Sequence, residues 1–490
     1  MMSMKKDIGT FKMNVQQGYA PKESTMSCEG VFAKYYFDIG KTQAKALLET
    51  PIMSACSTNP MNGQLERFLG FGLVGSEDGK SHRDDLNLVI VLDISGSMSE
   101  PFTGAKLDIF EDKKLAEKPG PEQKSKIDVA KFCVCEIIKK MKKNERLGII
   151  LFNSTKQILQ PLRDVSYLKI EDLLNKVSEI SANSGTNMQI GFETAVQMLK
   201  DQVEEDTMAK AQEDFPKNNR IIFLTDACPN IGEKLMLKDI ATQAAKDEYR
   251  IYTTYIGIGL DFNTDLVNEL TKVQGSNYFS VQSEKDFIKT LTEDFNYIVT
   301  PIVFDAQVSI ESGSFEIEKT FGSPFDDEEK HVGPLLKMET IIASDIKPEL
   351  GVKGGIVLAQ VKPKLPQVPM EENKKGESIK IILSYKEKSG ACLREVKEVS
   401  YDMSKKEEFY ETAGIRKAIL LSRYVTLIRG ILKRLNAERS KEEQLLKMKA
   451  YDEMKEEVSQ FKKYFLSEMK ALNDPQLNEE LDSLDCIKYS

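Results

Sequence analysis

Apolar runs and amphipathic periods alternate along residues 86–300 of this 490-residue chain. Aliphatic runs without polar alternation are typical of strands buried on both faces of a sheet. We expect such strands at Leu86–Ile94, Arg146–Phe152, Ile221–Thr225, Ile251–Ile258 and Tyr278–Val281. Apolar residues at helical spacing predict helices at Ile127–Met141, Leu168–Ile180, Met188–Leu199, Leu235–Lys246, Thr264–Val273 and Glu284–Val299. Because strands that alternate with helices form βαβ units, we predict an α/β domain with a doubly wound, mainly parallel sheet. Thr155–Leu159 is expected to pair antiparallel at an edge.

After Pro301 the helical periods stop and short strand-like segments follow, separated by Gly and Pro. We expect strands at Val303–Ile310, Ser314–Phe321, Lys337–Ile346, Gly355–Val361, Ile379–Tyr385 and Leu393–Tyr401. Short strands at this spacing are typical of an antiparallel sandwich. Phe11–Val15 and Val31–Phe37 are expected to join the same sandwich. The α/β domain would then be an insertion between the parts of the sandwich.

Helical spacing returns in the C-terminal part, with a turn at 436–440 between two periods. The pattern predicts a helical hairpin that packs on the body or, alternatively, presents a helix to a partner. The tail after Pro475 is acidic and is expected to be loose;. The predicted domains are 1–85 (β segments that join the sandwich), 86–300 (α/β domain), 301–403 (β-sandwich), 404–473 (helical hairpin) and 474–490 (acidic tail).

Oxygen-bearing side chains follow the first buried strand directly. The run Leu88–Leu92 ends in Asp93-Ile94-Ser95-Gly96-Ser97. In open parallel sheets, ligand sites lie beyond the carboxyl ends of the strands. One acid and two hydroxyls at alternate positions there could bind a hard metal ion, although an acid or serine after a strand is also a common helix N-cap.

Two more segments place oxygens at strand or helix edges. Thr186 precedes the helix expected at Met188–Leu199, and Asp226 follows the strand Ile221–Thr225. With these residues the chain resembles the von Willebrand factor A domain family over about residues 86–300, in a multidomain arrangement with a flanking sandwich and C-terminal helices. The resemblance identifies Asp93, Ser95, Ser97, Thr186 and Asp226 as that family's metal-ion-dependent adhesion site. It implies that the hydroxyls hold a divalent cation, that one or both acids act through bound water, and that a partner's carboxylate completes the shell.

The ligand chemistry favours magnesium. Mg²⁺ takes oxygen ligands and retains water, whereas Ca²⁺ prefers more ligands and several carboxylates. Neutral hydroxyls with only Asp93 and Asp226 therefore suit Mg²⁺ best, with Ca²⁺ or Mn²⁺ as alternatives. No His or Cys belongs to the set, which argues against zinc;.

Two departures from the family pattern concern the surroundings of the site. A long polar segment from Ser99 to Lys126 leaves the site before the next helix, where most relatives have a short connection. It could be a lid or a partner-selecting surface, or equally a tolerated insertion. Ala227 follows Asp226 where the family commonly has Gly. Neither departure removes an oxygen ligand.

The composition and net charge of the chain argue against some classes of partner and location. A net charge of -9 and a pI near 5.3 argue against a nucleic-acid binder;. No apolar run approaches the length of a membrane span, and the N terminus does not have the pattern of a secretory signal;. The seven scattered cysteines fit a reducing, cytoplasmic location;.

Three functions are compatible with these residues. The first is a non-catalytic interaction module or scaffold whose cation captures an acidic residue of a partner protein. The second is a structural subunit in which the cation is an internal staple. The third, a metal-dependent hydrolase, is disfavoured because the only histidines, His82 and His331, lie outside the metal segments;. The oligomeric state is not predicted.

Overall fold

Two compact units make up the chain. The computed structural model describes residues 26–40, 47–75, 84–101, 124–209, 217–226, 231–246, 248–258, 270, 272–281, 284–313, 315–323, 334–347, 349–364, 377–401, 407–438 and 444–485. One unit, the α/β unit, is Gly79–Pro301. The other, the β/helix unit, combines Met1–Asp78 with Ile302–Ser490. The finer domain boundaries expected from the sequence stay predictions.

A six-stranded sheet forms the centre of the α/β unit. Its strands are β6 (Leu86–Asp93), β7 (Arg146–Phe152), β8 (Lys156–Asp164), β9 (Asn218–Thr225), β10 (Ile251–Ile258) and β11 (Asn277–Val281). They lie in the order β11-β10-β9-β6-β7-β8, and all pairs are parallel except β7 with β8. Every residue of β6 and β10 is buried, which explains their aliphatic sequences;. The predicted doubly wound, mainly parallel α/β fold is confirmed.

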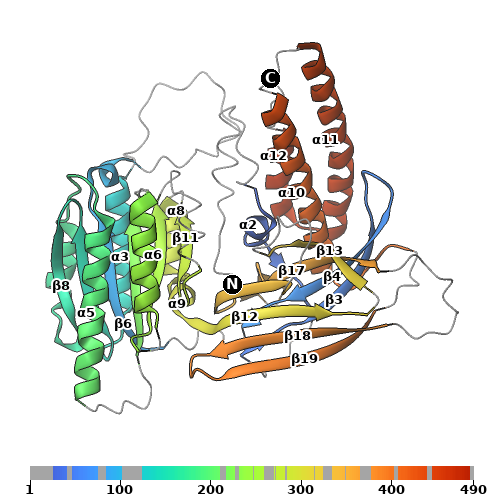
Figure 1. Ribbon diagram of the computed structural model, residues 1–490. Coiled ribbons are helices and arrows are strands. Elements are labelled where there is room, and N and C mark those ends of the chain that lie inside the picture. Colours follow the sequence, from blue (N-terminus) through green and yellow to red (C-terminus); the bar gives the residue numbers. More distant parts are fainter. Residues whose placement is uncertain are drawn as a thin grey trace. The chain divides into compact units, whose positions relative to one another are not determined.

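Two groups of helices pack along this sheet (Figure 1). The helices are α3 (Lys126–Lys140), α4 (Ile170–Ser178), α5 (Met188–Met208), α6 (Ile231–Ala244), α8 (Glu284–Thr292) and α9 (Phe295–Val299), with 3-10 turns η2 (Gly96–Ser99) and η3 (Val165–Tyr167). Helix α3 contacts α4 and α8, whereas α5 contacts α6, β6 and β7. Side-chain caps set the start of two helices: Ser125 Oγ accepts from the backbone N–H of Asp128, and Asn187 Oδ1 from that of Ile190;.

Some elements of the α/β unit differ from the expectation. The edge segment pairs antiparallel as predicted but extends to Asp164, so the strand is longer than Thr155–Leu159. The single helix expected at Glu284–Val299 is two helices. Helix α8 ends because the N–H of Asp294 bonds to the carbonyl of Lys289, a five-residue closure typical of helix C-termini;. The helix expected at Thr264–Val273 falls mostly outside the described residues.

Two larger sheets form most of the β/helix unit (Figure 1). The four-stranded sheet has the order β14 (Leu336–Ile342), β12 (Pro301–Glu311), β18 (Glu377–Glu387) and β19 (Cys392–Tyr401). The five-stranded sheet has the order β13 (Phe315–Phe321), β17 (Ile356–Pro363), β4 (Leu65–Gly72), β3 (Ile52–Thr58) and β20 (Phe409–Tyr410), with every neighbouring pair antiparallel. Smaller sheets join β1 (Tyr36–Phe37), β16 (Gly351–Lys353) and β15 (Ile346–Lys347), and β2 (Leu48–Glu49) with β5 (Val74–Gly75). Strands from both ends of the sequence therefore pair within one sheet.

The C-terminal hairpin belongs to the core of this unit. Helices α10 (Ala413–Glu438) and α11 (Gln444–Leu472) form the hairpin, and α10 contacts strands β3, β17 and β20. Ile356 and Leu358 of β17 share one apolar cluster with α10, and Val357 and Ala359 are buried on the opposite face of the strand. The five-stranded sheet is thus covered on both faces, by the hairpin on one side and the four-stranded sheet on the other (Figure 1).

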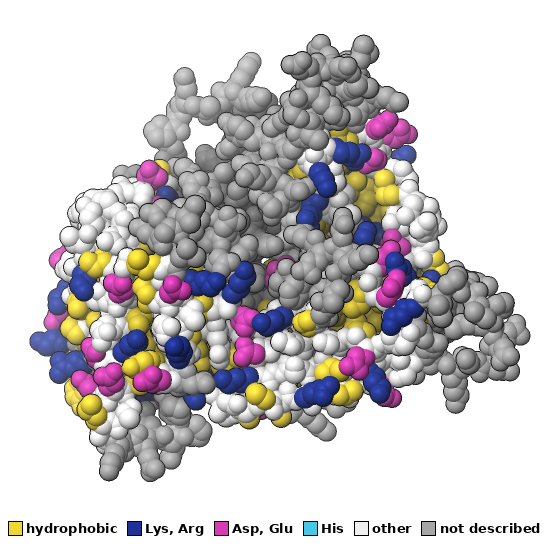
Figure 2. Space-filling view, in the orientation of Figure 1, with side chains coloured by type: hydrophobic (Ala, Val, Ile, Leu, Met, Phe, Trp, Pro, Cys, Tyr) yellow, Lys and Arg dark blue, Asp and Glu magenta, His cyan; other side chains and the backbone are white. Residues whose placement is uncertain are grey.

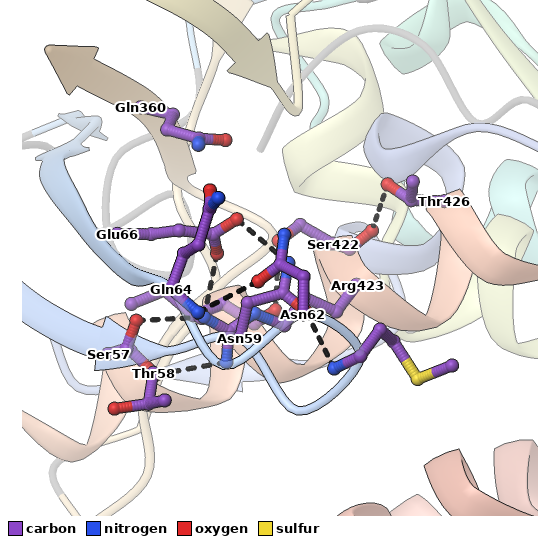
Figure 3. Close-up of polar contacts among 12 residues, drawn as sticks. Ser57, Thr58, Asn59, Asn62, Gln64, Glu66, Gln360, Ser422, Arg423 and Thr426 are labelled. Carbon is purple, nitrogen blue, oxygen red and sulfur yellow. Dashed lines mark hydrogen bonds and ion pairs between the residues drawn. The ribbon is translucent and has the colours of Figure 1, made fainter.

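A buried arginine ties the hairpin to the sheet (Figure 3). Arg423 of α10 donates from Nη1 to Ser57 Oγ at 2.9 Å and to Tyr464 of α11 at 2.8 Å. Its Nη2 donates to Glu66 Oε2 of β4 at 2.8 Å. Because a buried charge is stable only when it is paired and hydrogen-bonded, this network fixes α10 over β3 and β4.

Two strand expectations for this unit need correction, and a third stays a prediction. Residues Val31–Phe37 are not one strand: helix α2 (Cys28–Phe32) is followed by β1, because Ser27 caps the helix by accepting from the Gly30 N–H at 3.2 Å;. The strand expected at Lys337–Ile346 breaks into β14 and β15, since residues 343–345 belong to neither strand. Phe11–Val15 lies outside the described residues.

The acidic tail is not loose over its described part. A 3-10 turn, η4 (Pro475–Leu477), and helix α12 (Asn478–Asp485) follow Asp474, whose side chain caps the turn. The Glu480 carboxylate is fully buried, and it accepts from Tyr35 Oη and Lys34 Nζ, each at 3.0 Å. The charge of the tail suggested solvation, but one of its acids has partners from an N-terminal segment.

The surface of the described residues gives little information about the class of partner. Among the described helices, none has both the length and the apolar character needed to cross a membrane. On the face in Figure 2, Lys and Arg are interspersed with Asp and Glu, and the described side chains there form no continuous basic stripe.

Glu479 and Glu480 are neighbouring acids of the tail, and they provide a matched test of the contacts between α12 and the N-terminal segment. Glu480→Ala should lower the free energy of unfolding of the β/helix unit by about 2 kcal/mol, because Tyr35 Oη loses a buried charged acceptor. Glu479→Ala removes the same charge from an acid that is 61% exposed, and should change stability by less than about 0.5 kcal/mol;. Urea unfolding followed by circular dichroism compares the two variants, and equal effects would show that α12 does not depend on Glu480.

Candidate metal centre

The connections of the sheet create an opening at its carboxyl edge between β6 and β9. The chain leaves β6 toward β7 on one side, and β9 lies on the other side of β6. Such a switch point is where open α/β sheets bind ligands, because the loops after the two strands diverge. Asp93 is the last residue of β6, and Asp226 directly follows β9. Pairing of Leu92 with Leu224 therefore brings both acids to the same edge.

Asp93 is fully buried, and neutral donors hold both of its oxygens. The backbone N–H of Ser95 donates to Oδ1 at 2.7 Å, and the Thr225 hydroxyl donates to Oδ2 at 2.6 Å. Burial, with a smaller contribution from the nearby charge of Asp226, outweighs the lowering effect of these hydrogen bonds and raises the pKa of Asp93 from 3.8 to about 6. Without a cation, the ionised form of Asp93 is thus less favoured than that of a solvent-exposed aspartate;.

A chain of oxygen contacts joins three of the other predicted ligands. Ser95 Oγ and Ser97 Oγ share a hydrogen bond of 3.2 Å, and Ser97 Oγ donates to Asp226 Oδ1 at 2.8 Å. The turn η2 begins directly after Ser95 and carries Ser97, which places alternate hydroxyls side by side. Asp93, Ser95, Ser97 and Asp226 therefore lie in one connected cluster.

Thr186 lies on the neighbouring loop, outside this cluster. Its side chain is exposed, and among the described residues it is not part of the hydrogen-bond chain. Two backbone bonds attach its loop to the Asp93 loop: Gly96 N–H donates to the Ser184 carbonyl at 2.9 Å, and Asn183 N–H to the Ile94 carbonyl at 2.8 Å. Ser184 adopts a φ of 69°, a left-handed conformation that is uncommon for residues with a side chain;. The loop carrying Thr186 is thus held against the site.

A positively charged side chain, that of Lys126, also lies at this edge, and the sequence pattern did not indicate it. Lys126 Nζ donates to Asp226 Oδ2 at 2.8 Å and lies 3.4 Å from Glu100 Oε2. Burial lowers the pKa of Lys126, but its hydrogen bond to Asp226 and the charges of Asp226 and Glu100 outweigh burial, so the pKa is raised. Helical spacing predicted the helix that Lys126 begins, but nothing local indicated where the amine would point.

The donor set fits a small divalent cation. Oxygens on one edge of an octahedron around Mg²⁺ lie about 2.9 Å apart, because each Mg–O bond is about 2.0–2.1 Å. The Ser95–Ser97 and Ser97–Asp226 oxygen separations of 3.2 Å and 2.8 Å are close to this spacing. Among the described residues, no group of three or more His, Cys, Asp or Glu is placed to hold a metal.

Parts of the surroundings lie outside the described residues. These are 102–123, most of the polar segment that leaves the site, and 227–230, which include Ala227. The two ends of the polar segment are described. Pro101 and Ser125 form an antiparallel bridge, and the Lys126 N–H donates to the Glu100 carbonyl at 3.0 Å. The segment therefore leaves and returns at one point beside Ser97.

Comparison with known proteins gives one family match and a number of similar solved structures. Residues 88–229 match the sequence model of the von Willebrand factor type A domain. The structure is similar to a von Willebrand factor type A protein from Catenulispora acidiphila, at 13% identity and a TM-score of 0.41, covering 76% of this chain and 75% of that one. It is also similar to the ArnB paralog VWA2 from Sulfolobus acidocaldarius, at 11% identity and a TM-score of 0.40, covering 90% of this chain and 98% of that one. Comparison with curated proteins gives no match.

The raised pKa of Asp93 predicts a pH-dependent stability in the presence of a chelator. A carboxyl group whose folded pKa is about 6, above its ordinary 3.8, stabilises the fold below about pH 4 and loses that contribution as the pH rises through 6;. In Asp93→Asn, the amide oxygen can accept from the Ser95 N–H, and the amide nitrogen can donate to the Thr225 hydroxyl, so both contacts persist without the charge;. The metal-free variant should therefore be more stable than wild type above pH 6 by up to about 3 kcal/mol.

The measurement is the difference in unfolding free energy between wild type and Asp93→Asn from pH 4 to pH 8. Other titrating groups cancel in this difference. A difference that does not change with pH would contradict the assignment of the titration to Asp93.

Proposed function

Because residues 88–229 form a von Willebrand factor type A domain, we propose that this chain is a cation-dependent protein-interaction module. Domains of this type are typical of protein-interaction and adhesion modules. In the proposed site, Asp93, Ser95, Ser97, Thr186 and Asp226 hold one divalent cation, most suitably Mg²⁺, which captures a carboxylate of a partner protein. The observation that carries the proposal is the cluster of hydroxyl and carboxylate oxygens at the opening between β6 and β9.

The hydrogen bonds suggest a role for each ligand. Ser95 and Ser97 have hydroxyls that can turn from each other toward a metal, so they are proposed as direct ligands, with Thr186 from the adjoining loop. Asp93 already accepts from Ser95 and Thr225, so it is proposed to act through a bound water. The cation would supply Lewis acidity toward an incoming carboxylate. With few formal charges around it, it would remain electrophilic.

We assign no catalytic role to the site. The described side chains around it supply hydroxyls, two aspartates, Glu100 and an ammonium. His82 and His331, the only histidines of the chain, lie outside the described residues. A reducing, cytoplasmic location is proposed only from the odd number and scatter of the cysteines.

Metal titration tests the ligand set. Mg²⁺ and Mn²⁺ binding, measured by calorimetry, should weaken by at least about 100-fold in Asp226→Ala and Ser97→Ala, because each removes an oxygen of the cluster. Ser99→Ala is the matched control: it lies in the same turn, and its exposed hydroxyl donates to the Gly96 carbonyl rather than to the cluster. Equal affinities in all variants would contradict the site.

Partner capture tests the role of the bound cation. Affinity purification with wild type should recover a partner in Mg²⁺ and lose it in chelator, and Asp93→Ala should recover none in either condition. Thermal unfolding with and without Mg²⁺ separates the alternative. A large shift in melting temperature with unchanged partner recovery would identify the cation as an internal staple, whereas capture that depends on Mg²⁺ supports the interaction module.

A further inference from the structure

We propose that Lys126 is an internal cation that neutralises Asp226 until a metal ion displaces it. The proposal rests on the function proposed above and concerns how the site is loaded. It would make metal binding an exchange of one cation for another. It would also connect the metal to the start of helix α3, where Lys126 is the first residue.

The contacts show that the charge of Asp226 is already compensated. Its side chain is only 1% exposed, and that of Lys126 is 13% exposed. Ser97 donates to Asp226 Oδ1, and Lys126 donates to Oδ2 at 2.8 Å, so both oxygens have donors. A carboxylate this deeply buried needs a counter-charge, and Lys126 provides it.

An ammonium and a divalent cation cannot both lie against this carboxylate without strong repulsion. Their charges would be a few ångströms apart in a partly buried site, where screening by water is weak. A metal ion that uses Asp226 must therefore move the ammonium away. The chain offers a destination, because Glu100 Oε2 is only 3.4 Å from the same nitrogen and its side chain is 67% exposed.

Backbone contacts hold the start of helix α3 in place, so only the side chain of Lys126 has to move. The Lys126 N–H bonds to the Glu100 carbonyl, and the neighbouring Ser125 pairs with Pro101. Lysine has a flexible four-carbon stem, so the ammonium can move from Asp226 to Glu100 while the helix start stays in place. The geometry thus provides two carboxylates for one ammonium, one inside the site and one at its exposed rim.

Metal affinity tests the competition. Lys126→Met removes the charge and keeps an apolar stem, and should bind Mg²⁺ or Mn²⁺ at least about tenfold more tightly than wild type, since a charge-assisted hydrogen bond no longer has to be broken. Lys126→Arg keeps the charge and should stay within about threefold of wild type. Lys124→Met is the matched control: this lysine has a 59% exposed side chain paired with Glu284, so its loss should change affinity less than about twofold;.

Amine labelling of the wild-type protein tests the displacement directly. With limiting acetylating reagent, modification of Lys126 measured by mass spectrometry should rise several-fold when chelator is replaced by Mg²⁺, and modification of Lys124 should not change. This arm needs no variant, so it does not depend on whether Lys126→Met folds. Unchanged labelling of Lys126 would overturn the proposal.

The outcomes distinguish this proposal from the function on which it rests. If wild type binds Mg²⁺ but Lys126→Met binds it no more tightly than Lys124→Met, the exchange is wrong and the metal site stands. If wild type shows no saturable Mg²⁺ binding, both fail. Tighter binding by Lys126→Met, together with increased labelling of Lys126, supports the exchange.

Discussion

The parallel register between β6 and β9 is the constraint on which the candidate site depends. Leu92 pairs with Leu224, so the next residues of both strands reach the edge together. The hydroxyl of Thr225 can then donate to Asp93, and Asp226 lies within reach of Ser97. A shift of one residue would send these side chains to opposite faces of the sheet. The aliphatic strands thus do more than fill a core, because their alignment brings two acids to one point.

Two acids at one edge repel each other, and the protein compensates each in a different way. Asp93 has neutral donors, a backbone N–H and a hydroxyl, which only partly offset its burial, and its pKa is raised. Asp226 has a hydroxyl and a full positive charge from Lys126. The two acids therefore differ in their counter-charges, because Asp226 has a cationic partner and Asp93 has neutral donors only.

Sequence reasoning succeeded where the signal was local and failed where a distant partner decided the structure. The aliphatic run ending at Asp93 predicted β6, and the fold class followed from alternating strands and helices. Val31–Phe37 is an exception, because the missed signal there is local: the Ser27 cap starts a helix at Cys28 that runs to Phe32. Glu480 belongs to an acidic tail, and its burial depends on Tyr35, 445 positions away. Lys126 is similar, since its carboxylate partner is 100 positions away.

The bridge between Pro101 and Ser125 has a consequence for how the domain tolerates change. Because these two residues already pair as neighbours, the chain between them does not have to span any distance across the domain. Loop closure becomes only slowly more costly with length, so this connection can lengthen or shorten with little effect on the sheet beneath it. A turn of a few residues could join the same two ends. The rim of the site is therefore a place in this fold where new sequence can be inserted, by evolution or by engineering, while the oxygen cluster stays intact.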